Sequence, residues 1–174
     1  MKLILDTSAL LSGKDFFSST EYKIYTTPKV TDELKRPAKN DDRSDIERKF
    51  EYLVEAGLKI VTPSENSLIK VKTAAERTGD IKRLSPTDLE IIALALELTE
   101  THEEVIIFTD DYSIQNLSAE LDLKFKSVTE KGIAKKFFWK YKCSGCGKEW
   151  KEPLDICPIC GSKIKTKIKN KEKL

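Results

Sequence analysis

The chain has 174 residues, of which 39% are hydrophobic and 34% are charged, and its formal net charge is +2. These apolar side chains suffice for one globular core and a small appendage, which excludes disorder along the whole chain. No apolar run approaches the ~20 residues that cross a bilayer or forms a secretory signal, so we expect a cytoplasmic protein with no membrane partner.

The small net charge conceals two opposite parts. Residues 1–134 carry 19 Lys and Arg against 25 Asp and Glu, a net charge of −6. Residues 135–174 carry 12 against 4, a net charge of +8, and contain all four cysteines. The sequence therefore predicts an acidic body followed by a basic segment.

Short apolar runs rich in β-branched residues alternate with stretches of helical periodicity over the first 130 residues. The predicted strands are Leu3–Leu5, Lys23–Tyr25, Leu58–Val61, Val105–Phe108 and Lys124–Ser127. The predicted helices are one that begins at Pro28, then Asp45–Ala56, Ser64–Thr78, Ser85–Thr99 and Ser113–Leu121. This alternation indicates a parallel sheet covered on both faces, an α/β sandwich. We expect the polar segment Pro37–Arg43 to be a mobile loop.

Acidic residues stand where the carboxyl ends of the predicted strands should meet, the edge at which sites form in such sheets. Asp6 directly follows the first strand, Glu33 lies on the helix after the second, and Asp88 lies in the first turn of a strongly apolar helix. Asp110 and Asp111 follow the strand Val105–Phe108. Mg²⁺ and Mn²⁺ prefer oxygen ligands, and a pair of such ions can activate water against a phosphodiester. The set therefore predicts a catalytic divalent-metal site.

Most of these acids also have a structural interpretation. Asp88 can favour the dipole of its own helix, and Asp110 or Asp111 can cap the helix that starts near Tyr112. Asp6 is harder to explain in this way. A carboxylate at the end of a buried strand is costly unless it is paired or bound to a cation.

The order of these residues resembles that of the PIN-domain nucleases, over roughly residues 1–130. The matching motifs are Asp6-Thr7-Ser8 after the first strand, Glu33 on the second helix, Ser85-x-Thr87-Asp88, and Thr109-x-Asp111 after a later strand. The resemblance implies that these acids bind Mg²⁺ or Mn²⁺ and cleave single-stranded RNA. Asp110 occupies the variable position of the last motif.

Two C-x-x-C pairs predict a second metal site in the basic segment. Cys143, Cys146, Cys157 and Cys160 have the spacing that closes a tetrahedral Zn²⁺ shell, and the glycine after each pair permits a tight turn around the ion. A closed shell has no open position, so we expect this zinc to be structural. A disulfide pair and a rubredoxin-like iron site are the alternatives.

Lysines and aromatic residues interleave around these cysteines, a pattern suited to meeting phosphates and stacking on bases. The predicted RNA-binding residues are Lys135, Lys136, Trp139, Lys140, Lys142, Lys148, Trp150, Lys151, Lys163, Lys165 and Lys167. Trp139 and Trp150 can equally form the small core of a ribbon. Because a body of net charge −6 repels RNA except where metal ions mask its acids, we expect the body to cut and the basic segment to hold the RNA.

The expected organisation is a PIN-like domain (1–130), a linker (131–138), a zinc ribbon (139–164) and a basic tail (165–174) that binds phosphates electrostatically. This combination, with Gln115 and Asn116 in TDDYSIQN, resembles the archaeal form of the NIN-one-binding endonuclease family. The resemblance implies cleavage of the small-subunit ribosomal RNA precursor at its 3′ end, with the pre-ribosomal particle and assembly-factor proteins as partners. A noncatalytic RNA-binding assembly factor and a toxin-type PIN ribonuclease are the alternatives.

Overall fold

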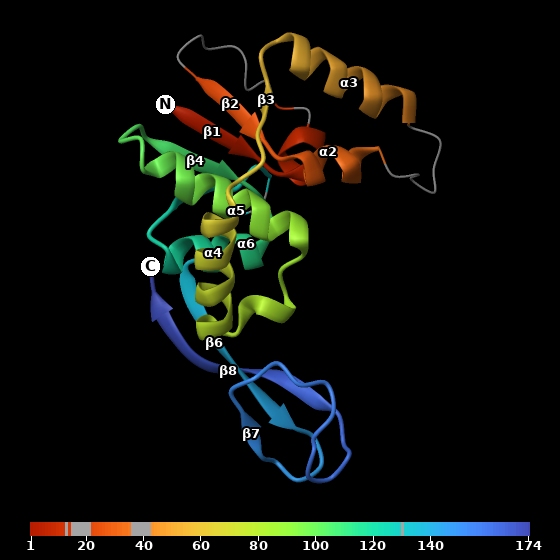
Figure 1. The fold of residues 1–174 in the computed structure, drawn as a ribbon, viewed down its shortest axis with the longest axis vertical. Coiled ribbons are helices and arrows are strands. Elements are labelled where there is room, and N and C mark those ends of the chain that lie inside the picture. The colour runs from red at the N-terminus through yellow and green to blue at the C-terminus, as the bar shows by residue number, and fades with distance from the viewer. Residues whose placement is uncertain (13, 15–21, 36–42, 130) are drawn as a thin grey trace.

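A computed structural model describes residues 1–12, 14, 22–35, 43–129 and 131–174. The centre of the N-terminal body is a five-stranded sheet of order β3-β2-β1-β4-β5 (Figure 1). Its strands are β1 (Lys2–Leu5), β2 (Lys23–Thr26), β3 (Lys59–Ile60), β4 (Val105–Phe108) and β5 (Lys124–Lys126). All neighbouring strands pair in parallel, as the alternation of strands and helices predicts.

Helices flank this sheet and complete the predicted α/β sandwich, which is confirmed (Figure 1). They are α1 (Thr7–Leu11), α2 (Pro28–Leu34), α3 (Arg43–Glu55), α4 (Glu65–Thr78), α5 (Pro86–Thr99) and α6 (Tyr112–Glu120), with a 3-10 turn, η1, at Asp80–Lys82. The predicted loop Pro37–Arg43 lies outside the described residues except for Arg43, where α3 begins. None of the helices in the described ranges is both long and apolar enough to cross a membrane.

The core of the body forms around the middle strand β1 and helix α5. All four residues of β1 are buried, and residues 91–95 of α5 are fully buried. Helix α5 is buried on nearly every side because it packs against α4, β1 and β4. Residues at the end of β1 and at the start of α5 are therefore held by well-packed elements.

The basic segment folds as a three-stranded antiparallel sheet of order β7-β6-β8. The central strand β6 (Lys135–Cys143) pairs near its end with β7 (Glu149–Trp150) and along its whole length with β8 (Ile164–Lys173). This three-stranded basic sheet extends away from α3, and β8 brings the C terminus back towards the body (Figure 1).

This arrangement differs from the expected division into linker, ribbon and tail. Residues 135–138, expected in the linker, form the first part of β6. Residues 165–173, expected as a free basic tail, belong to β8. The physical reason is that β6 would otherwise expose a row of unpaired backbone donors and acceptors, which β8 satisfies.

Candidate active site and metal centre

Three of the predicted acids cap helices at the carboxyl edge of the sheet. Asp6 caps α1, Asp111 caps α6, and Asp88 forms a capping box with Ser85 at the start of α5. Their carboxylates accept backbone N–H groups of Ala9 (2.8 Å), Ser113 (2.6 Å) and Ser85 (2.7 Å), respectively. Of the two residues expected to cap α6, Asp111 is the cap, and Asp88 lies in the first turn of α5, where the helix dipole favours its charge as expected. The hydrogen bonds fix the direction of each carboxylate.

Threonine hydroxyls connect the acids across neighbouring elements. Thr109 donates its hydroxyl hydrogen to Asp6 Oδ2 and accepts the backbone N–H of Asp111 at 3.0 Å. Glu33 on α2 is held from two sides, by Thr7 at 2.8 Å and by Thr87 at 2.6 Å. Two networks result: Thr109 joins Asp6 to Asp111, and Thr7 and Thr87 hold Glu33, with Asp88 one residue beyond Thr87.

These threonines were not predicted as site residues. The signal that could have found them is their position inside the acidic motifs, beside Asp6, Asp88 and Asp111. A hydroxyl next to a buried carboxylate supplies the hydrogen bond that the carboxylate loses on leaving water.

Burial and mutual repulsion act together on the acids. Asp6 is only 6% exposed, and burial raises its pKa, against hydrogen bonds from Thr109, Ala9 and Ser8 that lower it. Burial also raises the pKa of Asp88, and the negative charges of Asp111 and Glu33 add to this rise. The negative charge of Asp111 therefore reaches both Asp6 and Asp88, and that of Glu33 reaches Asp88, an arrangement that a cation relieves.

The acids fit a divalent ion that keeps part of its water shell. Within the described ranges, the second oxygens of Asp88 and Asp111 accept no hydrogen bond and are available as ligands. The acid oxygens are spaced more widely than a closed cage, since among the described residues only the four cysteines bring three or more ligand atoms within 4.8 Å of one another. Mg²⁺ usually retains several waters and binds through one or two carboxylates, which suits this open spacing.

The structure places Asp110 in a different setting. Its Oδ1 accepts the backbone N–H of Val128 at 2.8 Å, and its Oδ2 accepts the hydroxyl of Thr129 at 2.6 Å. These bonds tie the end of β4 to the segment after β5. Asp110 thus anchors a loop, and its catalytic role stays a prediction.

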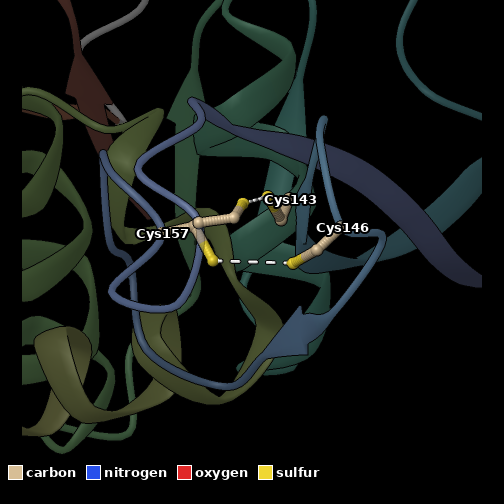
Figure 2. Close-up of side chains that lie close together, drawn as sticks. Cys143, Cys146 and Cys157 are labelled. Carbon is tan, nitrogen blue, oxygen red and sulfur yellow. Dashed lines mark hydrogen bonds between the residues drawn. The ribbon is translucent and has the colours of Figure 1, made fainter.

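The four cysteine sulfurs converge at the end of the basic sheet that lies farthest from the body. Figure 2 shows Cys143, Cys146 and Cys157 directed towards one another, with the Cys146 and Cys157 sulfurs 3.7 Å apart. The Cys143 and Cys160 sulfurs are 3.3 Å apart, and all four cysteines are free. A tetrahedral ion with metal–sulfur bonds of about 2.3 Å needs sulfurs about 3.8 Å apart, whereas a disulfide needs about 2.05 Å. The cluster therefore fits a zinc ribbon and excludes the disulfide alternative.

The backbone around the cysteines is shaped for such an ion. Gly147 and Gly161 have φ of +73° and +70°, the left-handed turns that the glycine after each pair predicts. A Cβ on Gly145 would lie 2.3 Å from Ser162 Oγ and 3.3 Å from Cys160 Sγ, so no side chain fits beside that sulfur. Hydrogen bonds from Ser162 lower the pKa of Cys160 to about 6, which favours the thiolate that binds metal.

The predicted RNA-binding residues divide into two groups. Lys136 lies 2.7 Å from Glu120, and Lys140 lies 2.5 Å from Glu149, so both are engaged in ion pairs. The hydrogen bond to Glu120 is the main cause that raises the pKa of Lys136. Trp150 is half-buried beneath Lys148. The exposed lysines of the set are Lys135, Lys142, Lys148, Lys151, Lys163, Lys165 and Lys167.

Trp139 belongs to a contact between β6 and the body that the sequence did not predict. Its indole N–H donates to Oδ1 of the fully buried Asp80 at 2.8 Å, and Asn116 donates to Oδ2 of the same carboxylate at 2.8 Å. Asn116 also accepts the backbone N–H of Phe137 at 2.6 Å. Tyr141 donates its hydroxyl hydrogen to the Gly79 carbonyl at 3.0 Å. Through its hydrogen bond to Asp80, Trp139 joins the basic sheet to the body.

Comparisons with known proteins agree with this architecture. The model of the PIN domain of ribonuclease matches residues 3–98. Endoribonuclease Nob1 of Pyrococcus abyssi is 44% identical, with 95% of this chain and 92% of the relative covered. Endoribonuclease Nob1 of Methanothermobacter thermautotrophicus is 39% identical, with 94% and 91% covered. The 20S-pre-rRNA D-site endonuclease NOB1 of Saccharomyces cerevisiae is 39% identical over 55% of this chain and 20% of its own length.

The parallel sheet with an acidic carboxyl edge and the matching domain model define a PIN-domain ribonuclease. Such nucleases depend on divalent metal ions. The four-cysteine sheet and the similarity along nearly the whole chain narrow the class further, and the chain belongs to the Nob1 endoribonuclease family.

Proposed function

We propose that this endoribonuclease acts in ribosome biogenesis and cleaves the small-subunit ribosomal RNA precursor at its 3′ end, in the cytoplasm. The observation that carries the catalytic part is the position of Asp6, Glu33, Asp88 and Asp111 at one sheet edge, where Thr109 joins Asp6 to Asp111 and where Thr7 and Thr87 hold Glu33. The ribosomal part is supported by the name of the yeast relative, a pre-rRNA endonuclease.

Each acid has a defined part in this proposal. Asp88 and Asp111 direct their free oxygens towards Mg²⁺ or Mn²⁺, while Asp6 and Glu33 supply negative charge from positions held by hydroxyl groups. A bound divalent ion supplies an activated water and stabilises the charge that develops on the phosphate. The buried Asp6 cannot swing away from the edge, since both of its oxygens are hydrogen-bonded.

In this proposal, the basic sheet and its exposed lysines hold the RNA. One Zn²⁺ stabilises the end of the basic sheet, which has few buried side chains of its own. Its ligands are Cys143, Cys146, Cys157 and Cys160. Lys165 and Lys167 are exposed and alternate along β8, directly after the exposed Lys163, so the ammonium groups on the strand share one face that can follow a phosphate backbone.

The test uses a small-subunit precursor fragment that spans the 3′ end, with a 5′-end fragment of equal length as the control RNA. Wild-type protein with Mn²⁺ is expected to give one defined cut in the first RNA, lost on chelation and lost in Asp6→Asn at matched RNA binding. Equal cutting of both fragments would reject the ribosomal specificity and favour a toxin-type ribonuclease. Tight binding without any metal-dependent cut would favour the noncatalytic assembly factor.

A further inference from the structure

A small cavity lies beside the acidic edge, between the body and β6. Its volume is about 140 Å³, and its lining includes Arg83, Tyr112, Ser113, Ile133 and Phe137. Pockets that enclose whole drug-sized ligands measure about 300–1,000 Å³. This cavity therefore has room for a single ring system, such as a nucleobase, and not for a complete nucleotide.

Two of the motif acids border this cavity through their own chain neighbours. Tyr112 directly follows Asp111, and the backbone N–H of Ser113 donates to Asp111 Oδ1 at 2.6 Å. Arg83 lies two residues before Ser85, whose backbone N–H donates to Asp88 Oδ2 at 2.7 Å. Ser113 therefore both lines the cavity and bonds the Asp111 carboxylate, which connects the cavity to the acidic edge.

The lining offers aromatic faces and a cation. Tyr112, a large aromatic residue on the first turn of α6, is 54% exposed, so it is accessible to a ligand. Arg83 is exposed, and its guanidinium lies 4.3 Å from the centroid of the Trp139 ring. It attracts the Asp80 carboxylate electrostatically but forms no ion pair within the described ranges. The buried polar groups of the lining, Asp80 and Asn116, are already satisfied by each other and by β6.

Aromatic faces stack on any base, and a guanidinium binds phosphate. We propose that this cavity is a base subsite for the nucleotide next to the scissile phosphate, with Tyr112 stacked on the base and Arg83 facing the adjoining phosphate. This inference rests on the proposed function, because it requires an RNA strand across the acidic edge.

The test is a walk of single abasic sites along the small-subunit precursor fragment that spans the 3′ end. Wild-type protein, Tyr112→Ala and Tyr112→Phe are compared, with Tyr52→Ala as the matched control, since Tyr52 is 62% exposed on α3. Both kcat/KM with Mn²⁺ and Kd without divalent ion, from fluorescence anisotropy, are measured for each RNA. The anisotropy reports on the cavity whether or not the strand is cut.

One abasic position beside the cut is expected to lower the wild-type kcat/KM and affinity about tenfold, the effect of losing one stacked base. Tyr112→Ala should show the same loss on intact RNA and no further loss at that position. Tyr112→Phe keeps the ring and should retain the penalty at that position, and Tyr52→Ala should behave as wild type. A penalty that persists unchanged in Tyr112→Ala, or no penalty at any position, would overturn the subsite. An abasic position coupled to Tyr112 in binding, without metal-dependent cleavage by wild-type protein, would instead reject the proposed function alone.

Discussion

Single hydroxyl groups decide how the acids can be charged and still be buried. Thr109 is fully buried and bridges Asp6 and Asp111, so its hydroxyl offsets part of the cost of placing the Asp6 carboxylate inside the sheet edge. Groups that orient metal ligands in this way matter almost as much as the ligands themselves. Thr109 is therefore a residue whose effect on cleavage can be separated from its effect on packing.

Replacing Thr109 by Val, which has nearly the same shape but no hydroxyl, is expected to weaken Mn²⁺ affinity and cleavage about 10–100-fold. Thr109→Ser keeps the hydroxyl and should stay near the wild-type values. Isothermal titration with Mn²⁺ and single-turnover cleavage check both variants. Equal behaviour of the two would mean that the hydroxyl does not orient the acids.

The raised pKa of Asp6 also predicts how the stability of the protein depends on pH. Because its pKa is raised in the folded protein, the folded chain holds the Asp6 proton more tightly than the unfolded chain does. The stability contributed by protonated Asp6 is therefore present at low pH and lost as the pH rises above 3.8 and through the raised pKa. In chelator, Asp6→Asn should match wild type at low pH and become the more stable protein as the pH rises, because Asn still caps α1.

Thermal unfolding of both proteins across this pH range, without divalent ions, measures the difference directly. Saturating Mn²⁺ should then raise the unfolding temperature of wild type more than that of Asp6→Asn, which lacks one of the negative charges that attract the ion. A difference between the two proteins that is constant with pH would contradict the burial of a charged Asp6.

At the scale of elements, the contact between β6 and the body depends on one glycine. Gly79 ends α4 with φ of +82°, and a Cβ there would lie 2.8 Å from the Trp139 carbonyl oxygen. Its own carbonyl accepts the Tyr141 hydroxyl. The turn after α4 thus both permits and forms the contact with β6.

Gly79→Ala should destabilise the protein by about 1–3 kcal/mol and loosen β6 from the body. Gly57→Ala is the matched control, because Gly57 also has a positive φ (+107°) but no atom within 4 Å of the added Cβ. We expect the control to lose about 1–2 kcal/mol from backbone strain alone, without faster proteolysis of the basic sheet. Identical proteolysis of the two variants would contradict a docked β6.

Local patterns in the sequence carried the prediction of the body and of the cysteine site. The alternation of short apolar strands with helices specified the parallel sheet, and the two C-x-x-C pairs specified the four sulfurs. The alternation of Lys with Ile and Thr in residues 163–168 also has the period of a strand, but its charge suggested a free tail instead.

Long-range contacts account for what the sequence did not reveal. Nothing local to Asp80 or Trp139 indicates that the two will share a hydrogen bond, because 59 positions separate them. Buried acids and free surface acids have the same appearance in a sequence. Trp139 was predicted to stack on a base or to form the core of the ribbon. Its contact with Asp80 in the body could be seen only in the folded structure.

For the whole molecule, the contacts of β6 bring an acidic body and a basic sheet into one unit. The ion pair between Lys136 and Glu120 and the hydrogen bonds at Asp80 fix where β6 leaves the body, so the lysines of β8 keep a defined place relative to the acidic edge. In the proposed function, the lysines hold the RNA strand while a short stretch of it crosses the acids.

The central claim is that the acids of the sheet edge act together on a divalent ion to cut RNA. The most direct measurement compares Glu33→Gln with Asp32→Asn, since the two residues are neighbours on α2 but only Glu33 is bound by Thr7 and Thr87. Mn²⁺-dependent cleavage of single-stranded RNA should fall by about 100-fold or more in Glu33→Gln and stay at the wild-type rate in Asp32→Asn, with equal RNA binding in both. Full cleavage by Glu33→Gln at the wild-type Mn²⁺ requirement would contradict the account.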